Sequence, residues 1–273
     1  MTATTAPVTA PAPVTPARKS KLGWAVSDTL AITGRNLRAM QRVPEVIVFS
    51  TIQPILFVLM FRYAFGGAVR VPGVPYVDYL MPGIFAQTVA FGSINTGVGL
   101  AEDLQKGLIE RFRSLPMARM AVLAGRTMAD LVRSFAVIGL MIVMGFIVGF
   151  RIHTTAAALI PAVAILLLFA FALAWGFALI GLVAPNSESA QAASFPPMAL
   201  LTFASSAFVP LQSQPGWLQV FSARQPLTVT VNAVRALVLG GPTLTPVLQS
   251  VAWSVGIVMV FAPIAVARYR RAA

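Results

Sequence analysis

Residues 101–119 read AEDLQKGLIERFRSLPMAR, and this charged stretch separates two long apolar runs of the chain. As a helix it would carry apolar side chains on one stripe and most of its charges on the opposite face. The stripe consists of Leu104, Leu108, Phe112 and Leu115. Pro116 lacks an amide hydrogen, so such a helix should end before it. Because buried charges are costly in a bilayer, we expect the stretch outside the membrane, as a solvated loop or as a docking helix for a soluble partner.

The composition around this stretch is that of a membrane protein. Of 273 residues, 58% are hydrophobic and only 10% are charged, whereas a soluble domain carries roughly 25% charged residues. The net charge of +12 would also suit a nucleic-acid-binding protein. The basic residues, however, lie at the ends of apolar runs, which favours contacts with lipid headgroups over nucleic acid.

The N-terminal part divides into a tail and a helix. Residues 1–20 are rich in Ala, Pro and Thr, which predicts a disordered tail ahead of one transmembrane domain over residues 21–273. Residues 21–42 predict a basic amphipathic helix, with Arg35 and Arg38 opposite an apolar stripe. The stripe is Leu22, Val26, Leu30, Thr33, Leu37 and Met40. The helix could lie in the membrane interface or pack on a soluble partner.

Six apolar runs predict six transmembrane helices in an all-α protein. They are residues 46–65, 79–100, 134–150 with a charged N-terminal extension, 156–184, 190–209 and 244–267. Pro54 should kink the first helix, and Pro196 with Pro197 should break the fifth. The second helix contains glycines that permit close helix packing. They are Gly83, Gly92, Gly97 and Gly99.

The extension of the third helix carries Arg126, Asp130 and Arg133 at helical spacing. Side chains three or four residues apart share a face of a helix, so these groups should pair with one another.

The distribution of lysine and arginine predicts the orientation, because cytoplasmic loops are enriched in both. Six helices put both termini on one side, together with the loop at 101–119. That side holds Arg18, Lys19, Lys21, Arg35, Arg38, Arg42, Lys106, Arg111, Arg113, Arg119, Arg126, Arg268, Arg270 and Arg271, and the other side holds Arg62, Arg70, Arg151, Arg224 and Arg235. Both termini are therefore expected in the cytoplasm.

Residues 211–241, on the predicted outer side, are too interrupted to span and rather apolar for a free loop. Leu227, Val231, Val234 and Val238 would share one helical face. We expect two short re-entrant helices, with a surface hairpin as the alternative.

Several kinds of chemistry are missing. No lysine completes a phosphate-binding loop, cysteine is absent and His153 is the only histidine, so neither a catalytic site, a cofactor site nor a metal site is indicated. The carboxylates fall at or near predicted helix ends, although an ion-coupled carrier normally needs one inside the membrane. If this chain drives transport uphill, the energy must come from another polypeptide. A secondary carrier, a channel and a non-transporting assembly subunit remain the alternatives.

Residues 103–116, DLQKGLIERFRSLP, resemble the loop signature of ABC-2 type transport permeases. The matching positions are Gly107, Glu110, Arg111, Arg113 and Pro116. Leu108 stands where many members have Thr or Ile. The continuation at 117–131, MARMAVLAGRTMADL, is most similar to the daunorubicin-resistance branch of that family.

A second set of short segments also resembles the family. These are FVP at 208–210, PGWL at 215–218, QPLT at 225–228 and VRAL at 234–237. The resemblance extends from about Leu22 to the C-terminus.

The resemblance implies a bacterial plasma-membrane permease subunit that works with a second permease and two separate ABC ATP-binding subunits. ATP and Mg would bind to those subunits and not to this chain. The residues implied in coupling to them are Glu102, Asp103, Lys106, Gly107, Glu110, Arg111, Arg113, Pro116, Arg35 and Arg38. Glu110 and Arg111 are expected to form ion pairs across that contact.

The same resemblance implies ATP-driven export of a hydrophobic or amphipathic drug or lipid. Candidate extracellular gate residues are Trp217, Pro226 and Arg235. Candidate residues along the substrate path are Phe57, Phe61, Phe85, Phe91, Phe203 and Phe208, each of which could instead serve ordinary packing.

Overall fold

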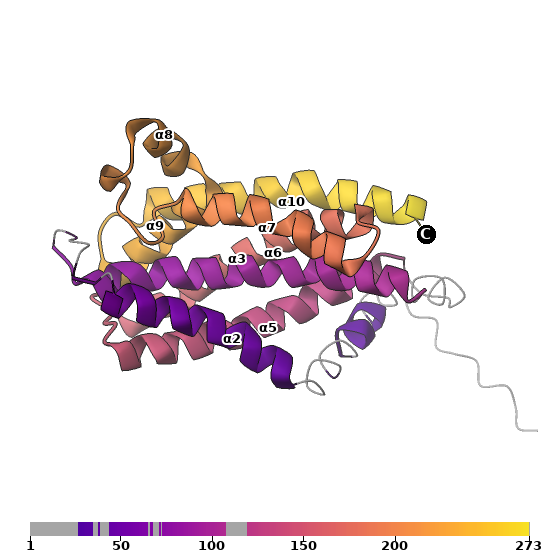
Figure 1. Cartoon of the computed structure of the whole chain (residues 1–273), viewed down its shortest axis with the longest axis horizontal. Coiled ribbons are helices and arrows are strands. Elements are labelled where there is room, and N and C mark those ends of the chain that lie inside the picture. The colour runs from indigo at the N-terminus through magenta and orange to yellow at the C-terminus, as the bar shows by residue number, and fades with distance from the viewer. Residues whose placement is uncertain are drawn as a thin grey trace, which may run out of the picture.

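The computed structural model describes residues 27–34, 38, 44–64, 66–67, 71, 73–107 and 119–272. Within these ranges every regular element is a helix, and the long helices lie along one common axis (Figure 1). The elements are α2 (Pro44–Leu59), η1 (Met60–Ala64), α3 (Tyr76–Gln105), α5 (Arg119–Val148), η2 (Ala156–Ala158), α6 (Leu159–Val183), α7 (Ser187–Phe203), η3 (Leu211–Ser213), α8 (Gly216–Arg224), α9 (Pro226–Leu239) and α10 (Leu244–Ala272).

Four segments of the described chain are long and apolar enough to cross a membrane. They are Tyr76–Gln105, Ala124–Val148, Ala156–Val183 and Leu244–Tyr269. These segments confirm the predicted second, third, fourth and sixth helices, so the chain is a multi-pass membrane protein.

The predicted first and fifth helices are shorter than these four. The helical path of α2 and η1 covers the first, and among the residues with described side chains Ile52–Ala64 is a shorter apolar helix. The fifth ends at Phe203 and not at residue 209. The break predicted at Pro196 and Pro197 is wrong, because α7 continues through both. Proline removes an amide donor but holds φ near the helical value, and here the helix persists.

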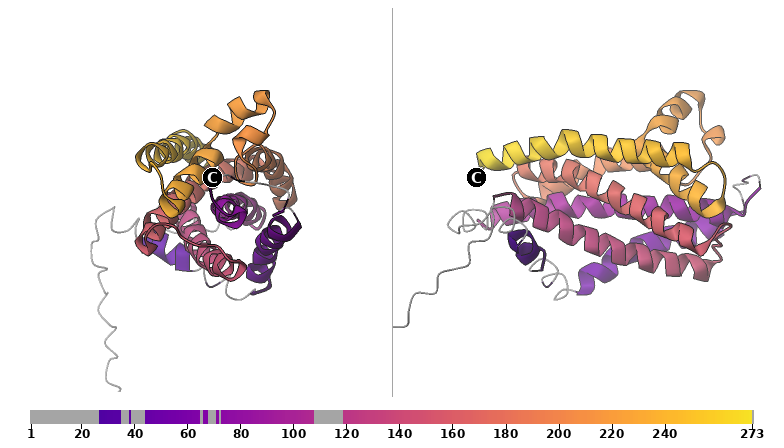
Figure 2. Two further views of the ribbon diagram at one scale, coloured as in Figure 1. Left: turned by 90° about the vertical axis from the view of Figure 1, so that its left-hand side faces the viewer. Right: turned by 180° about the vertical axis from the view of Figure 1, so that it is seen from behind.

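Helix α3 forms the centre of the bundle. Seen end-on, the other helices surround it (Figure 2). In its apolar window 72% of the residues are buried, against 17% for α10. It is also the least apolar of the four spans, which fits a membrane bundle, where small and polar residues face other helices and the most apolar ones face lipid.

Small residues bring α3 close to its neighbours, as predicted. If Gly97 carried a Cβ atom, that atom would lie 2.2 Å from the carbonyl oxygen of Phe177 in α6. A Cβ atom on Gly181 would lie 2.1 Å from the carbonyl oxygen of Gly97. Gly83 is equally close to the carbonyl of Ala207. The two backbones can approach this far only because no side chain stands between them.

The described turns before α2 pack at the end of the bundle where α10 finishes (Figure 1). Ile32 lies in an apolar cluster that includes Leu100, Trp175 and Tyr269, and Thr33 Oγ1 donates to the Gly125 carbonyl at 3.1 Å. Leu30, which the predicted stripe contains, is exposed. Thr33, which belongs to the same predicted stripe, is buried. Most of the predicted helix, including the rest of the stripe, lies outside the described residues.

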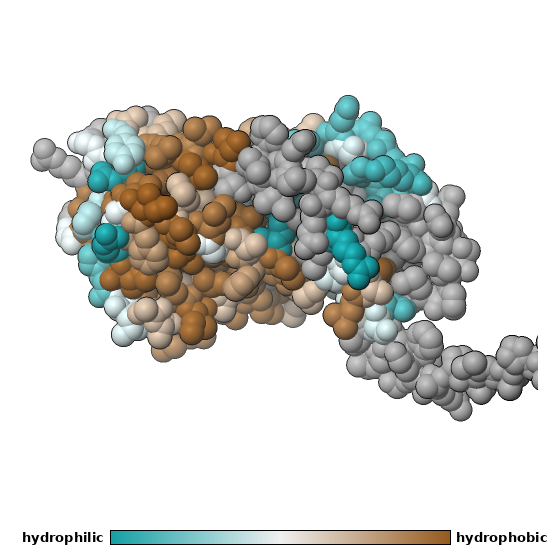
Figure 3. All heavy atoms as spheres, turned by 90° about the horizontal axis from the view of Figure 1, so that it is seen from below, coloured by the Kyte–Doolittle hydropathy of each residue, from teal (hydrophilic) through white to brown (hydrophobic). Residues whose placement is uncertain are grey.

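The surface separates by polarity. On the face in Figure 3, apolar side chains cover the middle of the described surface, while hydrophilic ones gather toward its two ends. This pattern is expected of a protein with a hydrocarbon-facing belt between two aqueous ends.

Candidate functional site

An unwound segment, residues 204–210, follows α7 and is largely buried. Backbone groups buried without helical hydrogen bonds must find other partners. Here each carbonyl from residue 204 to residue 208 accepts a hydrogen bond from a side chain. We call the donating side chains the carbonyl clamp. Gln225 donates to the carbonyl of Ala204, Gln214 to that of Ser205, Tyr79 and Arg235 to that of Ser206, Arg235 to that of Ala207, and Tyr76 to that of Phe208.

Arg235 is the centre of the carbonyl clamp and is only 9% exposed. Its Nη2 donates to the Ser206 carbonyl at 2.7 Å, and its Nε donates to the Tyr79 carbonyl at 3.0 Å. The guanidinium carbon also lies 3.5 Å from the centroid of the Tyr79 ring, within range of a cation–π contact. Arg235 thus ties α9 to α3 and to the unwound segment.

The N-terminus of α9 is fixed to the same segment. The Gln225 side chain caps the helix by accepting from the Leu227 amide at 3.2 Å, and its Nε2 donates to the Leu201 carbonyl at 2.8 Å. The Ser206 amide donates to Thr228 Oγ1 at 3.1 Å. Segments that are separate in the sequence, 208–210, 225–228 and 234–237, therefore meet at one place.

The predicted pair of short helices between the fifth and sixth spans is present as α8 and α9. All four apolar residues that were predicted to share a face of α9 are buried. Leu227, Val231, Val234 and Val238 are each at most 1% exposed. The surface-hairpin alternative is therefore wrong for α9.

The three predicted gate residues occupy different environments. Trp217 on α8 is 77% exposed, Pro226 begins α9 and Arg235 is buried in the carbonyl clamp. Of the three, Trp217 alone is exposed enough to contact a compound that leaves the protein. Arg235 is buried and hydrogen-bonded to α3 and to the unwound segment, as is typical of a structural residue.

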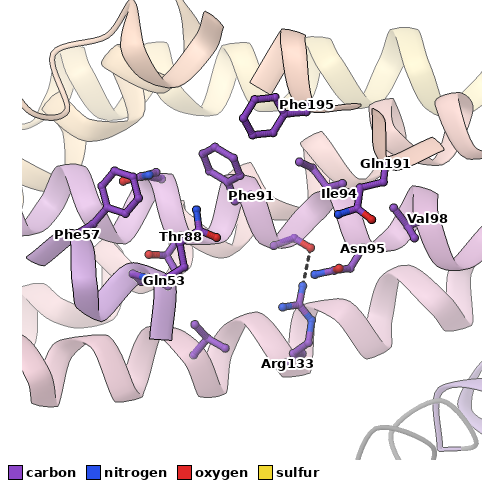
Figure 4. A pocket seen from close by; sticks show the side chains of 14 residues that line it. Gln53, Phe57, Thr88, Phe91, Ile94, Asn95, Val98, Arg133, Gln191 and Phe195 are labelled. Carbon is purple, nitrogen blue, oxygen red and sulfur yellow. Dashed lines mark hydrogen bonds between the residues drawn. The ribbon is translucent and has the colours of Figure 1, made fainter. Parts of the chain in front are cut away.

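A cavity of about 320 Å³ lies between α2, α3, α5 and α7, and we call it the bundle pocket. Aromatic and polar side chains line it together (Figure 4). The aromatic ones are Phe57, Phe91 and Phe195, and the polar ones are Gln53, Gln87, Thr88, Asn95, Arg133 and Gln191. Such a mixture can hold a molecule that is apolar in part and polar in part.

Arg133 reaches from α5 toward the pocket and α3 (Figure 4). Its Nη2 donates to the Gly92 carbonyl at 2.6 Å, and its Nε lies 3.5 Å from Asp130 Oδ1. Asp130 also accepts from Thr96 Oγ1 at 2.5 Å. The predicted pairing of Asp130 with Arg133 is confirmed. Arg126 instead pairs with Asp103 of α3, a partner that helical spacing within one helix cannot reveal.

Two polar atoms on the pocket wall have no hydrogen-bond partner in the described structure. They are Gln87 Oε1 and Thr88 Oγ1, whose residues are 5% and 8% exposed. An unsatisfied buried acceptor costs free energy. Rotation of either side chain toward the cavity would let a bound molecule with hydrogen-bond donors recover that cost.

The predicted aromatic path is partly brought together. Phe57 and Phe91 line the bundle pocket. Phe57 also stacks on Phe61, and Phe61 stacks on Phe208 of the unwound segment with ring centroids 4.4 Å apart. Phe203 is 6.3 Å from Phe208. An aromatic run thus connects the pocket to the carbonyl clamp.

Phe85 does not belong to this run. It is 2% exposed and contacts Phe150 edge to face at 5.9 Å, so it is a core residue. Phe195, which was not among the predicted residues, lines the pocket 6.4 Å from Phe91.

At the other end of α3 the predicted coupling stretch begins differently from the expectation. Glu102 and Asp103 belong to the last turns of α3, which ends at Gln105, so the expected separate helix does not start at residue 101. Gly107 follows with a φ of +63°, a backbone conformation that glycine adopts readily at a helix end. Arg38 is exposed. The remaining predicted coupling residues lie outside the described part: Glu110, Arg111, Arg113, Pro116 and Arg35.

Two ion pairs at this end differ in burial. Lys106 Nζ donates to Glu102 Oε1 at 2.5 Å, and both side chains are at least half exposed. The hydrogen bond from Lys106 to Glu102, helped by the negative charge of the carboxylate, raises the pKa of the lysine above its ordinary value. The pair between Arg126 and Asp103 is mostly buried, with side-chain exposures of 20% and 15%.

We predict that the Asp103–Arg126 pair stabilises the contact of α3 with α5. Asp103→Asn and Arg126→Gln should each destabilise the bundle, and a double-mutant cycle should give a coupling energy of about 1 to 3 kcal/mol. The measurement is SDS-titrated unfolding followed by tryptophan fluorescence. The matched cycle, Glu102→Gln with Lys106→Gln, should give no measurable coupling because both groups are exposed. Equal coupling in the two cycles would show that burial of the inner pair contributes nothing.

At the opposite end, Asp78 in α3 is buried at 2% exposure. It accepts from the Arg151 amide at 2.8 Å and lies 2.7 Å from His153 Nε2. The His153 amide in turn donates to the Val238 carbonyl at 2.9 Å. His153 is thus an interface residue that joins α3, the loop after α5 and α9.

Sequence reasoning missed the polar lining of the bundle pocket. The missed polar residues are Gln53, Gln87, Thr88, Asn95, Arg133 and Gln191. A signal was available, because polar side chains inside apolar spans are costly and usually face the bundle interior or a cavity.

Known proteins resemble this chain over most of its length. Residues 27–239 match the family described as ABC-2 type transporter. A daunorubicin resistance ABC transporter permease protein of Streptomyces coeruleorubidus is 32% identical over 246 residues, which cover 90% of this chain and 87% of that protein.

Two further relatives come from other organisms. A probable doxorubicin resistance ABC transporter permease protein of Mycobacterium tuberculosis is 28% identical over 90% of both chains. A putative transport permease of Cyanophora paradoxa is 26% identical over 78% of this chain and 74% of that protein. With the matched region covering the helices from the first described turn to the end of α9, this chain belongs to the ABC-2 type transporter family.

Proposed function

We propose that this chain is the membrane subunit of an ATP-driven exporter that moves a hydrophobic or amphipathic compound, a drug or a lipid, out of the cell. The observation that carries the proposal is the bundle pocket, where three phenylalanine rings and several uncharged polar groups line a cavity inside an apolar bundle. The names of the relatives, which are resistance permeases for daunorubicin and doxorubicin, support the same compound class.

The energy source in this proposal is a separate ABC ATP-binding subunit that holds ATP and Mg. It docks on the cytoplasmic end of the chain, through residues 102–116 and the helix that contains Arg35 and Arg38. In support, the described part of this end carries the exposed Glu102, Lys106 and Arg38. The distribution of lysine and arginine supports cytoplasmic termini in the inner membrane. A second permease, a copy or a relative, completes the transporter.

Within this scheme the compound enters the bundle pocket and leaves along the aromatic run toward the carbonyl clamp. Phe57, Phe61 and Phe208 supply stacked apolar surface over that distance. Trp217, which is exposed on α8, would line the exit. Movement of the docked ends of α3 and α5 would change the pocket, because Asp130 and Arg133 of α5 contact Thr96 and Gly92 of α3.

The test is transport of an anionic fluorescent amphiphile, of doxorubicin as a cationic one and, separately, of a fluorescent phospholipid, in proteoliposomes that contain this permease with or without its cognate ATP-binding subunit. Transport should require both that subunit and hydrolysable ATP, and a protonophore should not abolish it. Equal transport without the ATP-binding subunit would overturn the proposal.

A proton-driven carrier has one observation in its favour, the position of Asp130 between α3 and α5. Transport that follows a proton gradient and is lost in Asp130→Asn would support the carrier.

We predict that Glu110→Lys lowers ATP-dependent transport at least tenfold while membrane insertion is unchanged. Reversal of a charge within a partner contact replaces attraction by repulsion, which costs about 2 kcal/mol or more when the pair is desolvated. Transport and the amount of copurified ATP-binding subunit are measured together. The control is Arg224→Glu, a reversal at an exposed residue of α8, which should leave both unchanged. Normal transport by the Glu110 variant would remove the docking role.

A further inference from the structure

We propose that Arg133 makes the bundle pocket selective for ligands that present an anionic group or a strong oxygen acceptor on an aromatic or apolar body, and disfavours ligands with a cationic amine. The inference rests on the proposed function in one respect, that the exported compound occupies this pocket. It goes further by stating the sign of the charge that the pocket accepts.

Among the described residues that line the cavity, Arg133 is the only one with a charged side chain. The neighbouring carboxylate of Asp130 is not part of the lining. One of its oxygens accepts from Thr96, and the other faces Arg133 Nε. Both carboxylate oxygens therefore have partners, and the charged group on the cavity wall is the guanidinium.

The guanidinium retains a donor for a ligand. Nη2 is bonded to the Gly92 carbonyl and Nε faces Asp130, while Nη1 has no hydrogen-bond partner in the described part of the chain. A guanidinium binds carboxylate, sulfonate and phosphate oxygens through charge-assisted hydrogen bonds, which are shorter and stronger than neutral ones. Figure 4 shows Arg133 directed from α5 toward the same space as Asn95 and Gln191.

The other polar groups of the pocket do not discriminate by charge. Gln53, Asn95 and Gln191 are carboxamides, each of which offers both donors and an acceptor. Gln87 and Thr88 also line the pocket, and their side chains can both donate and accept hydrogen bonds. These residues favour an oxygen-rich ligand, and the sign of its charge is left to Arg133.

Phe57, Phe91 and Phe195 define the apolar part of the ligand. Aromatic faces alone also attract cations. In this pocket, however, Arg133 lines the cavity and its partner Asp130 does not, so a ligand cation would meet the positive end of that ion pair in a medium of low dielectric constant. The volume of about 320 Å³ matches a ligand with one fused ring system and a short polar arm.

The experiment compares three probes that share one aromatic body. Dansylglycine is an anion, dansyl amide is neutral and N-dansylethylenediamine is a cation. Binding to the purified full-length chain in phosphatidylcholine nanodiscs is measured by dansyl emission, without an ATP-binding subunit. Dansylglycine should bind at least tenfold more tightly than the amine, with the amide between them. Equal or tighter binding of the amine overturns the proposal, as does failure of all three probes to bind.

Substitutions locate the effect. Arg133→Gln should weaken dansylglycine about tenfold and dansyl amide less than threefold, and Arg133→Lys should retain most of the preference for the anion. Arg224→Gln, at an exposed arginine of α8, should change nothing. Because Arg133→Gln leaves Asp130 without its partner, the double variant Asp130→Asn/Arg133→Gln is measured as well and should show the same loss of charge preference. An equal effect of Arg133→Gln on all three probes overturns the proposal.

The anionic group can belong to a soluble compound or to a lipid headgroup. Nanodiscs that contain phosphatidylglycerol distinguish these sources, since displacement of dansylglycine by that lipid identifies a lipid occupant, and its absence identifies a soluble one. Both results support an anion-accepting pocket. Because binding is measured without ATP, its outcome is independent of the transport assay. If the chain binds the anionic probe selectively but shows no ATP-driven transport, only the proposed function is wrong. If the chain transports but binds the three probes equally, only this inference is wrong.

Discussion

Replacement of Arg235 by methionine should lower the stability of the bundle by about 3 to 5 kcal/mol, because each buried acceptor that loses its donor costs about 1 to 3 kcal/mol. Methionine preserves most of the volume but none of the donors. The carbonyls of Tyr79 and Ala207 would lose the bonds that Arg235 gives them. Inside a membrane bundle, water cannot readily replace those donors.

The measurement for Arg235 is SDS-titrated unfolding of the purified permease, followed by tryptophan fluorescence. Arg224→Met is the matched control, because Arg224 is an exposed arginine at the end of α8. Arg235→Lys should recover only part of the loss, since an ammonium group cannot reproduce the planar fork that reaches three carbonyls and one hydroxyl. If Arg235→Met and Arg224→Met unfold at the same SDS concentration, the carbonyl clamp has no structural role.

The second large effect is expected at the contact of α3 with α6. Gly97→Ala should destabilise the bundle by about 3 kcal/mol, at the upper end of the cost of overpacking. The new Cβ would lie 2.2 Å from the carbonyl oxygen of Phe177, which is backbone and cannot rotate away. The two helices must therefore separate, and that movement disturbs the core around α3.

The control for Gly97 is Gly139→Ala, because Gly139 lies in α5 and a methyl group added there would meet nothing within 4 Å. There the substitution should be neutral or stabilise by about 0.5 to 1 kcal/mol, the usual gain of alanine over glycine within a helix. Gly181→Ala should resemble Gly97→Ala, and the double variant should cost less than their sum, since both changes force the same two helices apart. A stable Gly97→Ala permease would contradict the close approach of α3 and α6.

Arg235 and Gly97 should also affect transport, because each fixes the position of an element that borders the proposed path. Arg235 fixes the unwound segment that contains Phe208, and Gly97 sets the position of α3, which supplies much of the wall of the bundle pocket. Both residues act on the path by positioning it and contact no ligand in the proposed scheme.

Much of the fold follows from local properties of the sequence. The cost of placing a residue in hydrocarbon depends mainly on that residue, so apolar runs interrupted by charged ones predict spans without knowledge of their neighbours. Four of the six predicted spans are confirmed on this basis. The glycines of α3 were also informative, since a missing side chain permits close packing whatever the partner.

The contacts that a side chain makes with other helices of the bundle could not be predicted from these local properties. Periodicity groups Arg126, Asp130 and Arg133 on one face of α5, but it does not show that Arg126 pairs with Asp103 or that Arg133 reaches Gly92. Nor does it separate Phe85, which lies in the core, from Phe57, which lines the pocket. These choices depend on the rotation and depth of each helix against its neighbours.

The sequence by itself therefore determined an all-helical membrane chain, most of its spans and the charged stretch between the second and third. Only the tertiary structure decided that Arg235 is buried and bonded to the unwound segment, and that Arg133 of α5 and polar residues of three other helices surround one cavity. The physical reason is that hydrocarbon transfer is a property of single residues, whereas hydrogen bonds and cavities arise from groups that the chain brings together from distant positions.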